Sequence, residues 1–466
     1  MWDKKFFQKL AHLGVPDHML LRSSIGFQAH WKSITNLFDQ RALPEEPWDE
    51  SKIKQLLSIL NFLDSDKDPG SIRIGEREGR IATPYLADLC GNFCHGVGRS
   101  GNLTAAQPKA AGASLLQNLT NKLVLSLINS VGIPNLKGAL TVPMGTGMSI
   151  ALSLRGCFNH FGVDLHRHPD ILMTQVDHKS PRKGIEFIGG TIQTIPGKFG
   201  KNYYAEEGVY VDMEDLHQMY DSHRDSASAI VSNSAFFAPR VPDNLKKIAK
   251  FAQDHNLIHV INNAYGIQSK ELSTFIRKAI DAGRVDAIIQ STDKCFLTPV
   301  GGAVITSPTE EIINSISQAY AGRASASPVV QLLVSLLSMG KSGYRQKMEE
   351  QQKNRLHLEH QLLSLANSHH ERIIACNNPV SCAMTLSHLS SEKIGELGGY
   401  LYNMRVTGPR VVNIHQTDFG TCTTKEELMN SAINSYIVMN AAIGVDPHHI
   451  TEAILRLDEA FTQLNE

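Results

Sequence analysis

One lysine follows a largely apolar segment in a way that suits a covalently bound cofactor. Residues 285–290 lead into a polar turn that contains Lys294, and the turn 299–302 (Pro-Val-Gly-Gly) comes next. Upstream, the turn Gly145-Thr146-Gly147 precedes a helical segment, and Asn262 opens the turn Asn-Asn-Ala-Tyr-Gly. The N–H groups at a helix start bind phosphate, and a lysine amine condenses with the aldehyde of pyridoxal phosphate (PLP). The order of these three turns predicts a PLP enzyme.

Two further residues refine this prediction. Asn262 stands where many PLP enzymes of the aspartate-aminotransferase fold carry an aspartate under the pyridine nitrogen. An uncharged partner leaves that nitrogen less protonated and the cofactor a weaker electron sink, which suits elimination of a good leaving group. His178, in the segment 176–180 (Val-Asp-His-Lys-Ser), is predicted to stack on the cofactor ring. Each feature alone is more often an ordinary turn or a solvent-exposed residue, so their order carries the prediction.

A second group of residues has the composition of an anion site. Arginines lie among glycines in three segments, 75–80 (GEREGR), 95–101 (HGVGRSG) and 322–328 (GRASASP). Glycine lets the backbone approach an anion, and arginine supplies two parallel donors. An isolated arginine of this kind is more often solvated or salt-bridged, but three such segments favour a substrate that carries a second phosphate. The chain has no GxxxxGK[ST] motif, which excludes a Walker A loop.

The turns around Lys294 must be positioned by a sheet. Between residues 139 and 307, short apolar segments alternate with helix-like segments, a pattern typical of a mostly parallel sheet covered on both faces. Ligands of such sheets bind beyond the carboxyl ends of the strands. We therefore predict an α/β fold with a mostly parallel central sheet. The predicted strands are 139–142, 171–176, 229–232, 257–261, 285–290 and 303–306.

Different patterns flank this region. We predict helices at 51–63 and 115–131 before the first strand. After residue 328 we predict helices at 329–339, 346–366, 426–442 and 449–464, with strands at 383–386 and 411–412. The chain is thus expected to comprise a helical N-terminal extension (1–70) for tRNA or oligomer contacts, a large PLP-binding catalytic domain (71–325) and a smaller α+β C-terminal domain (326–466).

Composition limits the remaining classes of function. The 466 residues include 45 Lys and Arg against 46 Asp and Glu, so a nucleic acid would need a local basic patch. No apolar segment is long enough to span a bilayer, and the N-terminus lacks a signal-peptide core. Seven cysteines without a CxxC pair indicate reduced thiols. We expect a cytoplasmic protein with no metal and no membrane or DNA partner. The candidate basic patch is Lys4, Lys5, Lys9, Arg22 and Lys32.

Several long segments resemble one known family. From about residue 48 to residue 412 the chain is similar to the O-phosphoseryl-tRNA(Sec) selenium transferases. That resemblance implies a PLP-dependent transferase of fold type I that assembles as a homotetramer. It also implies conversion of O-phosphoseryl-tRNA(Sec) to selenocysteinyl-tRNA(Sec), by β-elimination and addition of selenium from selenophosphate. The segments are GEREGR, HGVGRSG, AQPKAAGASLL, PMGTGMS, DHKS, FAPRVPD, NNAYGIQS, PVGGAVI and GRASASP.

The resemblance implies roles for individual residues. Lys294 matches the lysine that binds the PLP aldehyde and then acts as general base. The other residues implied at the cofactor are Gly145, Thr146, His178, Asn262 and Arg77, the last reaching it across a subunit interface. The residues implied at the phosphoseryl phosphate are Arg99, Ser100, Gln107 and Arg323.

The chain departs from the family pattern at three positions. His178 stands where animal relatives carry glutamine, and Gly145 replaces an alanine. Met404 occupies the position of an arginine that reads the discriminator base of the tRNA. Arg405 and Arg410 are candidates to replace that arginine as tRNA-binding residues.

Two other functions stay open on the sequence. A PLP lyase or desulfurase acting on a free amino acid would also use Lys294, but it would not need the arginines at 99 and 323. A non-catalytic tRNA-binding protein would not need Lys294 at all, so the intact lysine argues against it.

Overall fold

The computed structural model describes residues 9–10, 12–176, 178–413, 427, 433 and 435–465. Asp177 of the DHKS segment, Lys4, Lys5 and residues 426, 428–432 and 434 of the predicted helix at 426–442 lie outside the described residues.

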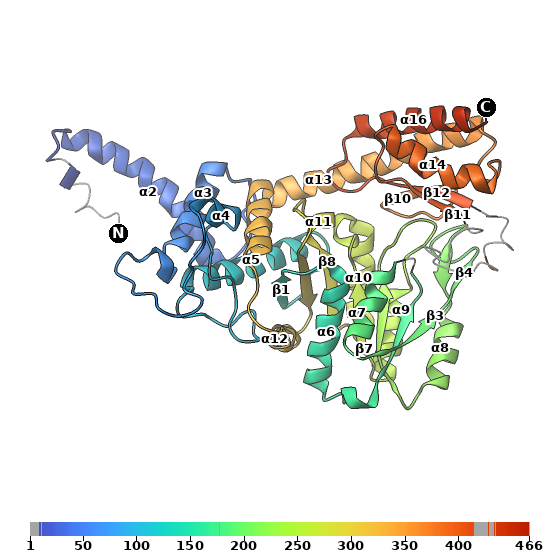
Figure 1. Ribbon diagram of the computed structural model, residues 1–466, viewed down its shortest axis with the longest axis horizontal. Coiled ribbons are helices and arrows are strands. Elements are labelled where there is room, and N and C mark those ends of the chain that lie inside the picture. Colours follow the sequence, from blue (N-terminus) through green and yellow to red (C-terminus); the bar gives the residue numbers. More distant parts are fainter. Residues whose placement is uncertain are drawn as a thin grey trace.

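The described residues form a central seven-stranded sheet with the order β1-β9-β8-β7-β6-β2-β3 (Figure 1). Strand β9 is antiparallel to both of its neighbours, whereas all other adjacent pairs are parallel. The strands are β1 (Gly138–Val142), β2 (Asp170–Thr174), β3 (Thr191–Ile195), β6 (Ala227–Asn233), β7 (Ile258–Asn262), β8 (Ala287–Ser291) and β9 (Ala303–Ser307).

All six predicted strands are confirmed. Every residue of β1, β2, β7, β8 and β9 is buried, as are the last five residues of β6. Burial on both faces demands continuous apolar segments, which are easy to find in a sequence. The sequence analysis missed β3, an edge strand whose residues are mostly half-exposed and polar. It also missed the two-stranded sheet of β4 (Gly197–Phe199) and β5 (Val209–Val211).

Helices pack around this sheet. Helix α6 packs on α7 and α12 and touches β7, β8 and β9, whereas α9 packs on α10 and touches β6 and β7. Helix α5 confirms the predicted helix at 115–131 and lies against β1. The helices are α5 (Ala111–Ser130), α6 (Thr146–Phe161), α7 (Lys179–Phe187), α8 (Met213–Ser222), α9 (Leu245–Asp254), α10 (Lys270–Ala282) and α12 (Glu310–Gln318).

One long helix connects the sheet to the C-terminal part of the chain. Helix α13 (Ser327–Ser368) contains both predicted helices at 329–339 and 346–366 and contacts α5 as well as α16 (Figure 1). It is interrupted at Gly340, whose φ is 60° and ψ −176°. A Cβ at this position would lie 2.8 Å from the carbonyl oxygen of Glu45, so glycine permits the N-terminal chain to cross here.

The C-terminal part is a three-stranded antiparallel sheet under helices. Strands β10 (Ser381–Thr385) and β11 (Arg410–Asn413) match the predicted strands and pair on either side of β12 (Ser435–Asn440). Helices α14 (Ser391–Asn403) and α16 (Pro447–Asn465) pack together, and α16 confirms the predicted helix at 449–464. The predicted helix at 426–442 is wrong over residues 435–440, because pairing with two neighbours and full burial favour an apolar segment as a central strand.

The N-terminal part begins with α2 (Asp17–Gln40), which projects from the rest of the molecule in Figure 1. Its last turns bury Ile34 and Leu37 in the main hydrophobic core. Helix α3 (Glu50–Asn61) confirms the predicted helix at 51–63 and packs on α5. The short segments η1 (Ser65–Lys67) and α4 (Pro84–Leu89) follow. None of the helices in the described part of the chain has the length and apolar character needed to cross a membrane.

Candidate active site

The predicted cofactor residues lie at one edge of the sheet. Strands β1, β2, β6, β7 and β8 run in the same direction, so their carboxyl ends meet at this edge. Lys294 lies in the short helix α11 (Thr292–Cys295) directly after β8, and Asn262 is the last residue of β7. Gly145 follows β1, and His178 follows β2. The topology therefore gathers residues that are far apart in the sequence.

Lys294 is partly buried, and the pKa of its amine is lowered. Its Nζ lies 4.3 Å from the centre of the Tyr265 ring. Burial lowers the pKa of the Lys294 amine, although Asp293 acts in the opposite direction. No ion pair of this amine with a carboxylate occurs among the described residues. A desolvated lysine with a lowered pKa is suited to bind an aldehyde and to accept a proton.

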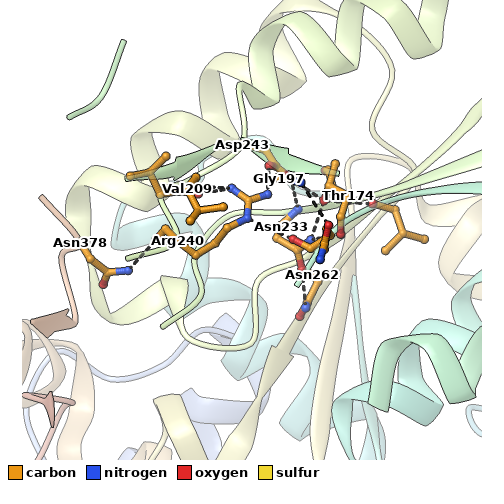
Figure 2. A network of polar contacts seen from close by, with 12 residues as sticks. Thr174, Gly197, Val209, Asn233, Arg240, Asp243, Asn262 and Asn378 are labelled. Atoms are coloured by element: carbon orange, nitrogen blue, oxygen red, sulfur yellow. Dashed lines mark hydrogen bonds and ion pairs between the residues drawn. The ribbon is translucent and has the colours of Figure 1, made fainter. Parts of the chain in front are cut away.

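Asn262 is held by a buried polar network (Figure 2). Its Nδ2 donates to Asn233 Oδ1 at 2.8 Å, and the backbone N–H of Ala264 donates to its Oδ1 at 3.3 Å. Asn233 Nδ2 donates in turn to Thr174 Oγ1 at 2.7 Å. Asn233 is the register partner of Asn262 in the sheet, which fixes the spacing of the two amides. The amide of Asn262 therefore has one preferred orientation.

The far end of this network is a buried ion pair. Asp243 Oδ2 accepts from Thr174 Oγ1 at 2.7 Å and from the backbone N–H of Asn233 at 2.8 Å. Its Oδ1 pairs with Arg240 Nη2, and both side chains are fully buried. Arg240 also donates to the carbonyl of Gln175 at 3.1 Å. Since the pair is neutral overall, no unbalanced negative charge reaches Asn262 through the network.

The start of helix α6 is a ready phosphate cradle. Gly145 is its N-cap and no side chain caps the helix, so the first N–H groups are available to an anion. Thr146 is the first helical residue. A Cβ added to Gly145 would meet no atom within 4 Å, whereas one at Gly147 would lie 2.1 Å from Ser180 Oγ. Gly147 is thus required for the close packing of α6 on α7.

His178 lies beside Lys294 and is fixed by the backbone. Its Nδ1 accepts a hydrogen bond from the Ser180 N–H at 3.0 Å, which caps helix α7. Burial lowers the pKa of His178, and the charges of Lys294 and Arg410 lower it further. The ring lies 6.3 Å from that of Phe236, at 67°. A neutral imidazole is therefore favoured at this edge of the sheet.

The two candidate tRNA-binding arginines lie in different surroundings. Arg410 lies at the start of β11, and its charge lowers the pKa of His178. Its Cζ lies 5.5 Å from the centre of the Phe237 ring. Arg405 follows α14 in a left-handed conformation, with φ of 62°, and is exposed. Met404 packs against the C-terminal hydrophobic core. Of the two arginines, Arg410 is the one whose charge acts on a predicted cofactor residue, His178.

The predicted phosphate residues form a second group, built from two paired loops. The backbone of Val97 pairs in both directions with Ala324, at 2.9 and 3.1 Å, and the Gly101 N–H donates to Gly322 at 3.2 Å. These bonds bring the Arg99–Ser100 turn beside Arg323. Ser100 has a φ of 42°, and the Arg99 N–H closes the turn on Asn102 at 2.8 Å.

Arg323 has two guanidinium nitrogens that are suited to bind an anion. Its Nε and Nη2 atoms are buried and have no hydrogen-bond partner among the described residues. Burial lowers the pKa of Arg323, and nearby Arg77 lowers it further. Buried polar groups without partners are rare because they cost free energy. An arginine fork in this state fits a phosphate.

The two other predicted residues flank this group. Arg77 is exposed and pairs with Glu76 at 3.3 Å. Its charge acts on Arg323, whereas the charges that act on Lys294 are those of Asp293 and Cys295. Gln107 lies at the entrance to α5, where its N–H donates to Ser114 Oγ at 3.0 Å. Among the described residues, no hydrogen bond or ion pair joins the Arg323 group to Lys294. The sequence analysis missed Tyr265, Asn233 and the Arg240–Asp243 pair as site residues, although NNAYGIQS and FAPRVPD contain three of the four.

The described residues offer no competing site of the predicted kinds. They include no group of three or more His, Cys, Asp or Glu placed to hold a metal ion. Two cavities of about 440 and 880 Å³ are lined by residues of α5 and α12 and of α10 and α13, respectively. Neither contains a predicted site residue.

Comparison with known families agrees with this arrangement. The model of the family O-phosphoseryl-tRNA(Sec) selenium transferase matches residues 63–462. The chain belongs to this family. It is therefore related to a group of PLP-dependent enzymes, and the predicted resemblance is confirmed.

Relatives and solved structures support the assignment. The O-phosphoseryl-tRNA(Sec) selenium transferase of Methanocaldococcus jannaschii is 38% identical over 447 residues, covering 96% of this chain and 98% of the relative. That of Caenorhabditis elegans is 32% identical, covering 93% and 89%. A crystal structure of the archaeal enzyme superposes with a TM-score of 0.87 at 35% identity, covering 96% of this chain and 98% of that one. A mouse CSAD structure, with a TM-score of 0.55 at 12% identity, covers 94% and 98% and shows the shared fold alone. The predicted fold type I is confirmed.

Proposed function

We propose that this chain converts O-phosphoseryl-tRNA(Sec) to selenocysteinyl-tRNA(Sec) with selenophosphate as the selenium donor. The observation that carries the proposal is that Nε and Nη2 of the half-buried Arg323, beside the Arg99–Ser100 turn, are buried without a hydrogen-bond partner among the described residues. A PLP lyase or desulfurase acting on a free amino acid would not need this second anion site. The family assignment supports the tRNA-linked substrate.

The residues at the sheet edge fit PLP. The uncapped start of α6 suits its phosphate, and the lowered pKa of Lys294 suits bond formation with its aldehyde. Asn262 would meet the pyridine nitrogen with a neutral amide, and His178 would cover one face of the ring. When bound, PLP supplies an electron sink for the negative charge that develops at the substrate α-carbon.

Different side chains bind the substrate phosphate and transfer the proton. With its amine free, Lys294 Nζ would remove the α-proton as general base. Arg323, Arg99, Ser100 and Gln107 bind the phosphate of the phosphoseryl group and keep it in place while the β-carbon–oxygen bond breaks. The selenium of selenophosphate then forms the new bond to the β-carbon, Lys294 Nζ returns the proton to the α-carbon, and water cleaves the selenium–phosphorus bond with release of inorganic phosphate.

The assembly is also part of the proposal. We propose a cytoplasmic homotetramer in which Arg77 reaches the cofactor of a neighbouring subunit, as the family resemblance implies; in support, the charge of Arg77 acts on Arg323, whereas the charges that act on Lys294 are those of Asp293 and Cys295. We propose Arg405 and Arg410 as tRNA-binding residues, and the three-part division of the chain at residues 70 and 325.

Turnover of three substrates tests the proposal. Phosphoseryl-tRNA(Sec) should be converted, whereas seryl-tRNA(Sec) and free O-phosphoserine should react poorly. Rejection of a substrate that leaves buried charges unpaired reaches about 10⁴-fold. Efficient turnover of free O-phosphoserine would favour the lyase, and a purified protein without PLP absorbance would favour a non-catalytic tRNA-binding protein.

Variants of Arg323 identify the residue responsible. Arg323→Ala should lose turnover of phosphoseryl-tRNA(Sec) while retaining PLP, and Arg323→Lys should restore little because a point charge does not replace the planar fork. The melting temperature is measured on the same preparation. If Arg323→Ala only loses thermal stability and its folded fraction turns over normally, Arg323 has a structural role instead.

A further inference from the structure

A buried carboxylate stands behind the Arg323 group. Asp64 is 1% exposed and lies between α3 and η1. Its Oδ1 accepts from the Ala113 N–H at 3.1 Å, in the first turn of α5, which has no cap of its own. Its Oδ2 is buried without a hydrogen-bond partner among the described residues. Oδ1 of Asp64 thus binds the first turn of α5, whereas Oδ2 makes no hydrogen bond to the described residues.

Asp64 and Arg323 belong to the same charged cluster. The negative charges of Asp64 and Glu78 favour the ionised form of Arg323, yet Asp64 and Arg323 form no ion pair within 4 Å. His95 is also buried there, with Nε2 3.4 Å from Asp66 Oδ1 and with the charge of Arg323 acting on it. The charged and titratable groups around Asp64 and Arg323 are Asp66, Lys67, Arg77, Glu78, His95 and Lys109.

We propose that Asp64 is a positioning residue that links occupancy of the Arg323 site by a dianion to the uptake of one proton. When a dianion binds beside Arg323, the Oδ2 of Asp64 takes up a proton from solvent, and the carboxyl returns that proton when the dianion leaves. This inference rests on the proposed phosphate site and adds a residue that the family resemblance did not indicate.

The direction of the linkage follows from the charges. Burial is the largest cause that raises the pKa of Asp64, to about 6, and the charge of Asp66 adds to it. A dianion nearby raises that pKa further, because like charges oppose ionisation. Below this pH Asp64 is neutral and does not repel the dianion, whereas above it the dianion binds either beside an ionised carboxylate, more weakly, or with uptake of a proton. Affinity for a dianion therefore falls as the pH rises through about 6.

The size of the effect is set by the additional pKa shift. A shift of one unit on binding corresponds to about a tenfold change in affinity. We expect the holoenzyme to bind a dianion about tenfold more weakly at pH 8 than at pH 5.5. Sulfate is a suitable probe because it remains a dianion over this range, unlike phosphate.

Sulfate binding to the holoenzyme, measured by calorimetry, tests the proposal. Asp64→Asn retains an acceptor for the Ala113 N–H but removes the charge, so it should bind sulfate about tenfold more tightly at pH 8 and without a pH slope. Asp68→Asn is the matched control, since Asp68 is exposed in the same segment and only accepts from the Gly70 N–H at 2.9 Å. It should behave as wild type. A purely structural role of Asp64 would weaken binding instead of strengthening it.

Further measurements separate the possible failures. If Asp64→Asn keeps the wild-type affinity and slope, or if His95→Gln abolishes the slope, Asp64 is not the linked group. If Arg323→Ala binds sulfate as wild type does, the proposed phosphate site is itself wrong. Should Asp64→Asn not fold, titrating the wild-type holoenzyme at pH 7 in buffers of different ionisation enthalpy counts the protons taken up. A count of zero overturns the inference.

Discussion

Replacing Arg240 with methionine removes one half of the buried ion pair behind the cofactor site. Arg240 donates to Gln175 O at 3.1 Å, to Val209 O at 3.4 Å and to the carboxylate of Asp243. Methionine fills much of the volume but makes none of these bonds. Asp243 then remains as a fully buried charge with two neutral donors, Thr174 Oγ1 and the Asn233 N–H (Figure 2).

The expected loss of stability is large. Breaking a buried ion pair by removing one partner costs about 3–5 kcal/mol, and the two remaining donors to Asp243 favour the lower end, about 3 kcal/mol. Replacing both partners, Arg240→Met with Asp243→Asn, leaves no unpaired charge. The double variant should therefore lose at least about 1 kcal/mol less than the sum of the two single losses.

The assay is urea unfolding of the holoenzyme, followed by circular dichroism, with PLP affinity measured on the same preparations. Because Asp243 orients Asn233, and Asn233 orients Asn262, Arg240→Met should also weaken PLP binding. Strictly additive single losses would refute the argument that the two charges compensate each other. A loss of less than about 1 kcal/mol in Arg240→Met would refute the claimed cost of the unpaired carboxylate.

Three further predictions concern the cofactor edge. Lys294→Ala should abolish turnover and the absorbance of the lysine–PLP bond while the fold survives, and PLP-dependent turnover in this variant would exclude Lys294 as the cofactor lysine. Asn262→Asp should slow phosphate elimination and introduce transamination, because a carboxylate beside the pyridine nitrogen would favour its protonated form. Wild-type elimination without transamination, measured by product analysis, would contradict this. Gly145→Ala should leave stability and PLP affinity unchanged. Gly147→Ala should lower both, because the added Cβ would lie 2.7 Å from the Ser180 carbonyl oxygen. If the two variants have equal melting temperatures, the close-packing argument is wrong.

The local sequence pattern was sufficient to predict six of the seven strands of the central sheet. It was not sufficient to predict β12, in the smaller C-terminal sheet, as a strand. The buried strands that carry Asn262 and Lys294 are continuous apolar segments, so their positions could be predicted within two residues. Strand β12 is equally apolar but was interpreted as a helix. A short apolar segment has no intrinsic preference strong enough to decide, and its pairing with β10 and β11 comes from residues that lie elsewhere in the chain.

The sequence by itself determined the order of the turns that carry Gly145, Asn262 and Lys294. It also contained the motifs that indicate the family. Both are local properties, because a turn and the strand before it are contiguous in the chain.

Only the tertiary structure determined which side chains surround and orient these residues. The network that orients Asn262, the burial of the Arg323 fork and the carboxylate of Asp64 all depend on contacts between distant segments. Asp64 and Ala113, for example, are 49 positions apart. A polar side chain becomes buried without a partner, or has its pKa shifted by desolvation, only when other segments exclude water from it. No pattern within one segment records that event.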